Sequence, residues 1–492
     1  MMDGRRYDAI VIGAGSGGLT VAVGLARFGR RVALVEAGRV GGDCTNVGCV
    51  PSKRLIHLSR SVVRPIDPAS ILTAVRTTRD ALAARETEEI ASTAGIDLIR
   101  GRARLRPWRG VTVVHADGTE RQMTAPHVVI ATGSRPRGLE IPGLPQERLL
   151  TNETLFDLER APRHLAILGA GPVGVEMACA FARLGSRVTV VDPADRVLPT
   201  ADPAASEALE AAMVDQGIGI RLAARAVGYE RGSETLLVEG PAWRDRLDGV
   251  DAVLVAIGRS PNVEDVADAV ETGPGGVAVD AWGRTSAHGV WAVGDVTPVA
   301  HQTHAANAHG RRIVQAIALP WLPRLGRPPA IPSAVFSDPE VAWVGPGRAE
   351  KSGRWEPDAL CEVRVDLADT DRGLTDGVRH GFLAVTATRP FGRVVAATVV
   401  GPNAAELLPL LTLAVDRRMS LLRLQRMVHA YPTFAGAIGA VADQLAQEVL
   451  PRLGPELAAD ARRRLRRAAR AAATLRPGQR ESIEKPAAVP RP

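Results

Sequence analysis

The sequence has 492 residues, of which 46% are hydrophobic and 3% aromatic, as is typical of a globular α/β protein with about three domains. Four cysteines are too few for an extracellular disulfide framework, and no apolar run approaches the roughly 18 residues of a membrane span. Residues 451–492 hold 11 basic and 4 acidic side chains and carry the whole net charge of +7, so the neutral remainder gives no reason to expect nucleic-acid binding. The N-terminus leads directly into a strand without a secretory signal, and we expect a cytoplasmic protein.

A strand, a glycine loop, a helix and a second strand are predicted over residues 8–36. The apolar run 8–13 is typical of a buried parallel strand, and residues 31–36 form a second one after a helical pattern. The loop has the spacing that binds a dinucleotide, with one glycine for the tight turn, one for the approach of the pyrophosphate and one for close packing of the helix; an acid for the ribose follows. These residues are Gly13, Gly15, Gly18 and Glu36.

Residues 41–53 read Gly-Gly-Asp-Cys-Thr-Asn-Val-Gly-Cys-Val-Pro-Ser-Lys and contain two of the four cysteines. Cys44 and Cys49 lie beside the predicted dinucleotide, which indicates a redox-active dithiol. We expect one helix to begin near Cys44 and to run through Lys53, so that its positive end and the ammonium both favour thiolate. Lys53 is one of only three lysines among 61 basic residues, which favours a specific function for its compact charge.

The same fingerprint recurs 156 residues later. Between the two copies, the pattern predicts helix over residues 61–95 and short strands over residues 96–130. The strand, loop, helix and strand are then repeated over residues 166–192. The equivalent residues are Gly169, Gly171, Gly174 and Asp192. Two fingerprints predict two dinucleotides. Because an acid ends the second copy, where a 2′-phosphate would need a cation, we expect NADH, with NADPH as the alternative since Arg196 lies nearby.

Two further strands, over residues 251–262 and 290–296, complete the predicted nucleotide-binding part. Asp295 stands at the carboxyl end of the second strand, where open α/β sheets bind ligands. Residues 333–445 alternate strands with helical patterns and predict an α+β domain.

A basic tail follows. Residues 446–475 predict a single Ala/Arg-rich helix, and residues 476–492 predict disorder. The tail could touch an anionic membrane surface or an acidic partner, but we favour a solvated or dimer-docked appendage. Cys179 and Cys361 fall in apolar runs and are interpreted as buried, and the sequence shows no metal-ligand spacing.

The predicted fold is α/β, with two Rossmann-like dinucleotide-binding domains and a C-terminal α+β domain. We expect the following parts: the first portion of a dinucleotide-binding domain with the cysteine pair (1–150), a second dinucleotide-binding domain (151–272), the completion of the first (273–330), the α+β domain (331–450) and the basic tail (451–492).

These motifs resemble those of the flavin-dependent pyridine nucleotide–disulfide oxidoreductases, a family that includes dihydrolipoamide dehydrogenase, glutathione reductase and mercuric reductase. The resemblance covers about residues 6–445. Besides the fingerprints and the cysteine stretch, the chain carries Ala-Thr-Gly-Ser-Arg-Pro, Ala-Ile-Gly-Arg-Ser-Pro-Asn, Ala-Val-Gly-Asp-Val and Val-Phe-Ser-Asp-Pro-Glu in the family's order. The resemblance implies a homodimer with FAD on the first fingerprint and NAD(P)H on the second. It makes residues 1–150 and 273–330 the FAD-binding domain, residues 151–272 the NAD(P)-binding domain and residues 331–450 the dimerisation domain. The other residues that it assigns to cofactor binding are Gly42, Lys53, Thr132, Gly133, Gly258 and Asp295.

The resemblance also implies roles in electron transfer. Cys49 looks like the inner thiolate, which takes electrons from the flavin, and Cys44 like the outer thiol, which meets the acceptor. Lys53 would lie near the reactive nitrogen of the flavin and pair with Glu176.

The sequence departs from the family near its end. Disulfide-reducing members carry His-Pro-Thr-x-x-Glu, whose histidine serves the partner subunit's dithiol as an acid–base catalyst. Here Tyr431 stands in the place of the histidine and Gly436 in the place of the glutamate. His429, two positions upstream, is interpreted as structural in preference to catalytic.

A tyrosine is a poor proton donor for a leaving thiolate, whereas a soft metal ion held by thiolates needs no such donor. We therefore expect a mercuric-reductase-like enzyme that passes electrons through the dithiol to a small-molecule or metal-ion acceptor, with Tyr431 as a candidate site residue. Mercuric reductase, however, also uses a cysteine pair at its extreme C-terminus, and residues 487–492 contain none. The alternatives are dihydrolipoamide dehydrogenase, a flavin-only quinone or oxygen reductase, and a redox-sensing interaction protein.

Overall fold

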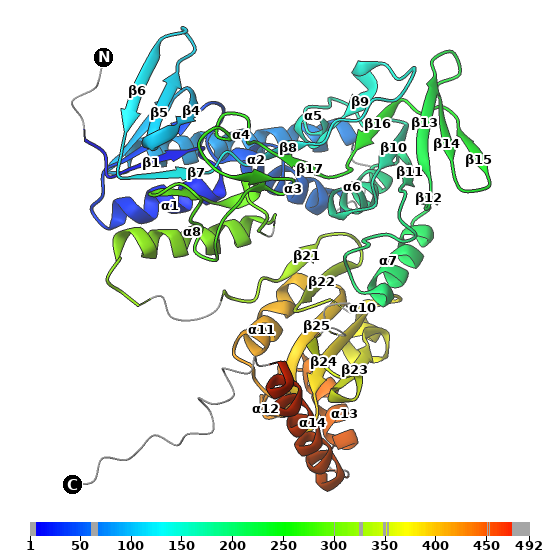
Figure 1. Ribbon diagram of the computed structural model, residues 1–492. Helices are drawn as coiled ribbons and strands as arrows, with labels where there is room; N and C mark the ends of the chain where they lie inside the picture. The colour runs from blue at the N-terminus through cyan, green and yellow to red at the C-terminus, as the bar shows by residue number, and fades with distance from the viewer. Residues whose placement is uncertain are drawn as a thin grey trace, which may run out of the picture. The chain divides into compact units, whose positions relative to one another are not determined.

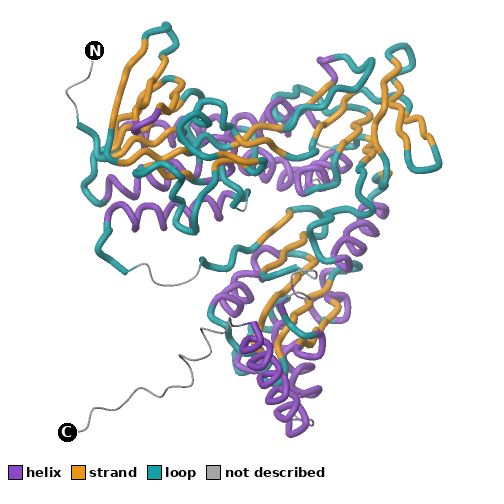
Figure 2. Tube along the Cα trace, in the orientation of Figure 1, coloured by secondary structure: helices purple, strands orange, loops and turns teal. Residues whose placement is uncertain are grey.

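The computed structural model describes residues 6–60, 67–299, 301–323, 328–347, 351, 354–449, 451 and 453–474. The chain divides into two compact units, Met1–Val341 and Ala342–Pro492. Both units combine helices with strands (Figures 1 and 2), and the predicted α/β class is confirmed.

A five-stranded parallel sheet forms the first half of the first unit, in the order β20-β7-β1-β2-β3. The central strand β1 is completely buried, because layers cover both faces of the sheet. The strands are β1 (Ala9–Ile12), β2 (Val32–Glu36), β3 (Ile96–Arg100), β7 (His127–Ile130) and β20 (Val290–Ala292).

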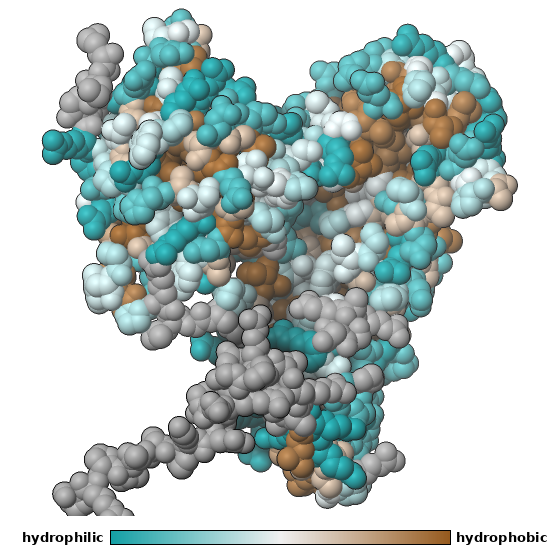
Figure 3. All heavy atoms as spheres, viewed as in Figure 1, coloured by the Kyte–Doolittle hydropathy of each residue, from teal (hydrophilic) through white to brown (hydrophobic). Residues whose placement is uncertain are grey.

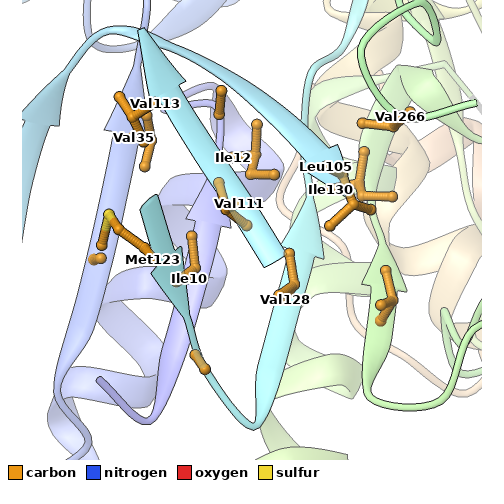
Figure 4. Packing of buried hydrophobic residues seen from close by; sticks show 14 of the residues in the cluster. Ile10, Ile12, Val35, Leu105, Val111, Val113, Met123, Val128, Ile130 and Val266 are labelled. Carbon is orange, nitrogen blue, oxygen red and sulfur yellow. The ribbon is translucent and has the colours of Figure 1, made fainter. Parts of the chain in front are cut away.

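Successive residues of β1 pack against different layers. Val11 belongs to a buried cluster with Leu25 of α1 (Ser16–Arg27) and Ile313 of α8 (Thr303–Ala318). Ile10 faces the other way and packs, as Figure 4 shows, against a three-stranded antiparallel sheet. The strands of that sheet are β4 (Arg102–Arg106), β5 (Gly110–Val114) and β6 (Glu120–Thr124).

The second half of the unit repeats this architecture, with a parallel sheet in the order β12-β11-β10-β16-β9. Helix α6 (Pro172–Arg183) packs on β10 and β11. A second antiparallel sheet, β13-β14-β15, shares a buried cluster with β10 and β16 and was not predicted from the sequence. The strands are β9 (Leu149–Leu150), β10 (His164–Leu168), β11 (Arg187–Val191), β12 (Gly219–Arg221), β13 (Arg225–Glu230), β14 (Thr235–Glu239), β15 (Arg244–Leu247) and β16 (Ala252–Val255).

The chain crosses between the two halves through two short antiparallel strands, β8 (Ser134–Pro136) and β17 (Arg259–Pro261). We call this pair the crossing ribbon.

The cysteine stretch lies in α2 (Gly42–Asn46) and α3 (Cys49–Arg60), and both helices contact α4 (Pro68–Ser92). The other elements are α5 (Asn152–Leu155), α7 (Pro203–Asp215), β18 (Thr272–Gly273), β19 (Gly276–Val277), β21 (Ser333–Val335) and the 3-10 helices Pro107–Arg109, Gln146–Arg148 and Gly294–Val296.

The second unit contains the predicted α+β arrangement. Its central strands β23, β24 and β25 are antiparallel, and β22 lies next to β25. Helix α11 (Ala404–Asp416) packs on β25, and helix α13 (Gly436–Val449) packs on β23 and β24. The elements are β22 (Glu340–Val344), β23 (Leu360–Asp366), β24 (Phe382–Thr388), β25 (Arg393–Gly401), α10 (Asp371–Asp376), α11 (Ala404–Asp416), α12 (Leu421–Leu424), α13 (Gly436–Val449) and the 3-10 helices Pro357–Ala359 and Leu367–Asp369.

The prediction of one helix over residues 446–475 was wrong. Helix α13 ends at Val449, and α14 (Leu453–Thr474) begins after Pro451, whose ring cannot continue the hydrogen-bond ladder of a helix. The predicted disorder of residues 476–492 lies outside the described residues.

Helix α14 contacts its own unit through polar side chains. The guanidinium of Arg463, only 3% exposed, donates to the carbonyl of Asp358, and Glu456 pairs with Arg389 at 2.8 Å. Leu465, by contrast, is 71% exposed. The polar face of the helix therefore packs against the unit, and part of its apolar face lies at the surface.

None of the described helices is both long and apolar enough to cross a bilayer. The face in view in Figure 3 mixes hydrophilic and apolar residues in both units.

Candidate functional site

The first glycine loop is shaped by backbone contacts that exclude side chains. Gly13 has φ +105°, and a Cβ on it would lie 2.3 Å from the Ala131 carbonyl oxygen; a Cβ on Gly18 would lie 2.0 Å from the carbonyl oxygen of Gly13. Helix α1 begins after Gly15, and no side chain caps its first turn. The loop therefore presents backbone N–H groups at the positive end of a helix, which suits the pyrophosphate of a dinucleotide.

The second loop repeats these contacts. Gly169 has φ +111°, and a Cβ there would lie 2.4 Å from the Ala256 carbonyl oxygen. A Cβ on Gly174 would lie 1.8 Å from the Gly169 carbonyl oxygen, and the space beside Gly171 is open. Glycine is thus required at the first and third positions of the loop in both copies.

The acids at the ends of β2 and β11 also make equivalent hydrogen bonds. Glu36 accepts from the backbone N–H of Ala14 and of Gly38, both at 2.6 Å. Asp192 accepts from Ala170 at 2.5 Å and from Ala194 at 2.7 Å. Each carboxylate is held next to its glycine loop, so the donors and acceptors of both loops fit a dinucleotide, as the predicted FAD and pyridine nucleotide require.

The cysteine stretch lies directly against the first loop. Gly42 has φ +57°, and a Cβ on it would lie 2.7 Å from the Cα of Gly15. The predicted single helix from Cys44 through Lys53 is wrong, because the chain breaks between α2 and α3 at Val47. The break makes Cys49 the first residue of α3, at the helix end that stabilises a thiolate.

The two thiols have opposite electrostatic environments. A hydrogen bond from the Cys44 thiol, a second from Thr303 and the charge of Lys53 lower the pKa of Cys49 to about 6, against the effects of burial and of Glu176. The same thiol pair and burial raise the pKa of Cys44. Thr303 Oγ1 lies 3.5 Å from Cys49 Sγ. The reduced pair therefore holds a thiolate at Cys49 and a thiol at Cys44.

Lys53 and Glu176 are paired, at 2.7 Å between Nζ and Oε2. Glu176, on α6, is buried and also accepts from the backbone N–H of Phe336 at 2.9 Å. The Lys53 ammonium lies 4.6 Å from the centre of the Phe336 ring. These contacts fix the ammonium next to the N-terminal half of α3, where its charge acts on Cys49.

The residues at the crossing ribbon form one hydrogen-bond network. Thr132 Oγ1 donates to the carbonyl of Asn262 at 2.7 Å, and the amide of Asn262 donates back to Thr132 at 2.9 Å. Gly133 (φ +67°) and Gly258 (φ +107°) are in the left-handed region that favours glycine. Asp295 accepts from the Ser134 hydroxyl at 3.0 Å.

Four residues that were not predicted from the sequence belong to this site. Thr303 touches the thiols, Phe336 contacts Lys53 and Glu176, and Arg259 binds Asp43, the residue before Cys44. Asp43, Arg259 and Phe336 lie inside recognised motifs, so they could have been found, whereas Thr303 lies in none and its contact depends on folding.

Tyr431 lies in the second unit and is 81% exposed. Its hydroxyl donates to Asp371 Oδ2 at 3.0 Å, and this hydrogen bond and the charge of Asp371 raise the pKa of the phenol. Asp371, at the start of α10, was not predicted. Gly436 begins α13, where a Cβ would meet open space.

The other cysteines are buried, as expected. Burial raises the pKa of Cys179 and of Cys361 to about 11, which makes both thiols unreactive. Among the described residues no group of three or more His, Cys, Asp and Glu side chains is placed to hold a metal ion.

The chain matches one family along most of its length. Residues 7–310 match the family described as pyridine nucleotide-disulphide oxidoreductase, and residues 331–442 match its dimerisation domain, which supports a homodimer. Dihydrolipoyl dehydrogenase 3 of Pseudomonas aeruginosa is 32% identical over 462 residues, 88% of this chain and 97% of that protein. Mercuric reductase of Streptomyces lividans is 32% identical over 467 residues, 90% of this chain and 97% of that protein.

Solved structures agree with this assignment. The Cu(II) complex of RclA, an HOCl-induced flavoprotein disulfide reductase of Escherichia coli, superposes with a TM-score of 0.81 at 26% identity and covers 89% of this chain and 99% of its own. LpdA of Mycobacterium tuberculosis gives 0.80 at 28% identity with the same coverage. The chain therefore belongs to the pyridine nucleotide–disulphide oxidoreductase family and is an enzyme that depends on FAD and a pyridine nucleotide.

Proposed function

We propose that this enzyme passes electrons from NADH through a Cys44–Cys49 dithiol to a thiophilic metal ion. The observation that carries the proposal is Tyr431, which stands where disulfide-reducing members of the family have an acid–base histidine. Its hydroxyl donates to Asp371, so its proton is already engaged. Reducing an organic disulfide requires protonation of a leaving thiolate, and a phenol with a raised pKa serves that step poorly.

A metal ion makes different demands on the site. Two thiols bind a soft ion such as Hg(II) or Cu(I) well, and binding displaces the thiol proton of Cys44 without a separate acid. One NADH supplies two electrons and releases one proton; the electrons reduce one Hg(II) to Hg(0), or two Cu(II) to two Cu(I). FAD, when bound, supplies the two-electron carrier between the nicotinamide and the disulfide.

The chain's own residues support the dithiol step. Cys49 is held as a thiolate by the Cys44 thiol, Thr303 and Lys53, so it is the inner member of the pair. Cys44 keeps its proton and is the outer member, which meets the acceptor. Glu176 holds the Lys53 ammonium in place.

Two relatives favour this acceptor class over others. One curated relative is a mercuric reductase, and RclA was solved as a Cu(II) complex. The relatives named dihydrolipoyl dehydrogenase favour the second candidate, lipoamide chemistry, which the Tyr431 and Gly436 substitutions disfavour.

An acceptor panel tests the proposal. NADH oxidation is measured with Hg(II), Cu(II), lipoamide, glutathione disulfide and a quinone, for wild type, Cys44→Ser, Cys49→Ser and the buried control Cys179→Ser. We expect metal-dependent turnover that either active-site substitution abolishes and the control retains. Turnover with lipoamide that is faster than turnover with either metal ion would contradict the proposal of a metal-ion acceptor. Quinone turnover that is retained in both Cys44→Ser and Cys49→Ser would favour a flavin-only reductase.

The coenzyme preference forms a separate part of the proposal. Asp192 presents a carboxylate where NADPH would need a cation for its 2′-phosphate, and both of its oxygens already accept backbone N–H groups. Arg196 extends to the carbonyl of Pro199 at 3.3 Å. We expect kcat/KM to be higher for NADH than for NADPH, and the reverse order would refute this part.

The basic helix α14 is proposed to be an appendage docked on its own unit in preference to a membrane-binding segment. The buried guanidinium of Arg463 and the pair between Glu456 and Arg389 support docking.

The alternative of a redox-sensing interaction protein predicts a different result. Such a protein would show negligible turnover with every acceptor, and it would bind a partner in a redox-dependent way that deletion of residues 451–492 abolishes.

A further inference from the structure

Arg259 lies where the chain crosses between its two nucleotide-binding halves. It is the first residue of β17, paired with Pro136 of β8 in the crossing ribbon. Its side chain is 25% exposed and reaches back to the ribbon, where Nε donates to the Ser134 hydroxyl at 2.7 Å and Nη2 donates to the Ser134 carbonyl at 2.7 Å. The crossing ribbon therefore accepts hydrogen bonds from two of the three guanidinium nitrogens of Arg259, Nε and Nη2.

The same guanidinium binds the helix that carries the outer cysteine. Nη2 of Arg259 also donates to the carboxylate of Asp43, the residue before Cys44 in α2. Burial, the largest effect, raises the pKa of Asp43, Arg259 opposes this rise, and Asp295 adds to it. Arg259 therefore lies between two carboxylates that would otherwise repel each other, 3.8 Å from Asp295 on one side.

A second arm of the network reaches the break between the two cysteines. Nη1 of Arg259 donates to Oδ1 of Asn152 at 3.2 Å, and Nδ2 of Asn152 donates to the carbonyl of Val47 at 3.2 Å. Val47 follows the last residue of α2, and Cys49 begins α3 two residues later. Arg259 thus holds both ends of α2, one directly through Asp43 and the other through Asn152 at Val47. The position of α2 sets the distance between the two sulfurs.

The segment has few other constraints of this kind. The amide of Asn46 donates to the carbonyls of Val40 and Gly42, which stabilises α2 internally, and Thr45 donates to Glu86 of α4. These bonds hold α2 to itself and to α4, whereas Arg259 and Asn152 connect it to the crossing ribbon and to α5.

We propose that Arg259 is a positioning residue for the redox pair, which holds α2 through Asp43 and Asn152 so that Cys44 stays within bonding reach of Cys49. This inference rests on the proposed dithiol function. The planar fork of arginine is what allows one side chain to bind the ribbon, Asp43 and Asn152 together; a lysine ammonium cannot reach all three. Loosening α2 lowers the effective concentration of one thiol towards the other and so destabilises the disulfide.

The disulfide equilibrium with glutathione measures this effect without turnover. Oxidation removes two electrons from the pair and forms the Cys44–Cys49 bond, while one glutathione disulfide is reduced to two glutathiones. The Cys44 proton and one proton from solvent go to the glutathione sulfurs. The fraction of disulfide is read by alkylation and mass spectrometry after anaerobic equilibration of the holoenzyme in buffers of different glutathione ratio.

We expect Arg259→Gln to lower the equilibrium constant for disulfide formation by about tenfold, which is a rise of about 30 mV in the two-electron potential. Asn152→Ala, which removes one arm, should change the constant in the same direction by a smaller factor. Arg259→Lys should lie between wild type and Arg259→Gln. Arg135→Gln is the matched control, because Arg135 lies in the same ribbon but pairs with the exposed Glu264.

A second readout follows the inner thiol. Because the Cys44 thiol is the largest influence that lowers the pKa of Cys49, displacement of α2 should move the alkylation midpoint of Cys49 to higher pH in Arg259→Gln but not in Arg135→Gln. FAD content and melting temperature are recorded for each variant, and Arg259→Lys is used if Arg259→Gln loses FAD. If both Arg259 variants keep the disulfide potential and the Cys49 alkylation midpoint of wild type, this inference is wrong and the proposed function stands. If the wild-type protein forms no Cys44–Cys49 disulfide, the inference and the proposed function are both wrong.

Discussion

The ammonium of Lys53 lies 2.7 Å from the carboxylate of Glu176, 123 residues further along the chain, although arginine serves almost every other cationic position of this sequence. The pair joins α3, which begins with Cys49, to the first turns of α6, which follow the second glycine loop. Both nucleotide-binding halves thus contribute to the charge that acts on Cys49.

Lys53→Met should raise the pKa of Cys49 above its value of about 6, by about one unit, because one cationic influence on the thiolate is lost. The pH dependence of iodoacetamide alkylation at Cys49 in the reduced enzyme measures the shift. Lys351→Met is the matched control, since Lys351 lies in the second unit and donates to Thr386. An unchanged midpoint in Lys53→Met would show that the lysine does not act on this thiol.

In the wild-type reduced enzyme, Cys49 should titrate with a midpoint near pH 6 and Cys44 should remain a thiol well above it. The folded pKa of Cys49 lies below that of an unfolded thiol, about 8.5. The thiolate therefore contributes stability to the reduced form that is complete above about pH 8.5 and is lost as the pH falls through 6. Unfolding of the reduced enzyme at pH 5 and pH 9, compared with Cys49→Ser, checks the sign; equal pH dependence in both proteins would contradict the lowered pKa.

Restoring the family's acid–base pair should change the acceptor. Tyr431→His with Gly436→Glu should raise lipoamide turnover by at least about tenfold, in the range that a positioned general acid contributes. A Cβ at Gly436 meets open space, so the glutamate can be accommodated. Tyr431→Phe should leave metal-ion turnover within about twofold of wild type, because the phenol donates no proton to that reaction. A large loss of metal turnover in Tyr431→Phe would mean that the hydroxyl takes part.

Gly42→Ala should weaken both FAD binding and the fold. The added methyl would lie 2.7 Å from the Cα of Gly15, and Gly42 has φ +57°, so we expect a cost of about 1–3 kcal/mol in the free energy of unfolding. FAD release on dilution and chemical denaturation measure the two effects. Gly138→Ala is the control, since a Cβ there meets no atom within 4 Å. FAD affinity equal to wild type in Gly42→Ala would refute the close approach of the two loops.

Helix α14 should come away from its unit when its buried guanidinium is removed. Arg463→Ala should increase proteolysis within residues 453–474, whereas Arg464→Ala, whose side chain is 72% exposed, should not. Membrane binding is the opposing outcome, and it is measured by co-sedimentation with vesicles rich in phosphatidylserine. Binding by wild type with no change in proteolysis of Arg463→Ala would favour the membrane over docking.

Motif spacing was sufficient to predict both parallel sheets, because strand, glycine loop and helix are adjacent in sequence. The pairing of Lys53 with Glu176 was expected only from the family resemblance, since no local rule connects residues that far apart. The sheet β13-β14-β15 was missed because its strands alternate weakly and carry many charges, as in Arg225–Glu230 and Arg244–Leu247.

The two helix errors have local causes. The pattern from Cys44 through Lys53 has helical periodicity on both sides of Gly48, but a Cβ there would lie 2.8 Å from the carbonyl oxygen of Asp43, and the chain turns between α2 and α3. The tail pattern continues through Pro451, which separates α13 from α14. The contacts of Arg259, Thr303 and Asp371 depend on long-range folding and could not be predicted from spacing.

Anaerobic titration of the purified holoenzyme with NADH tests the central claim most directly. If the Cys44–Cys49 disulfide takes up electrons from the flavin, wild type should consume two equivalents of NADH per FAD and develop long-wavelength absorption from a thiolate beside the oxidised flavin, while Cys49→Ser should consume one equivalent without that absorption. Uptake of a single equivalent by wild type, with no difference from Cys49→Ser, would contradict the dithiol account.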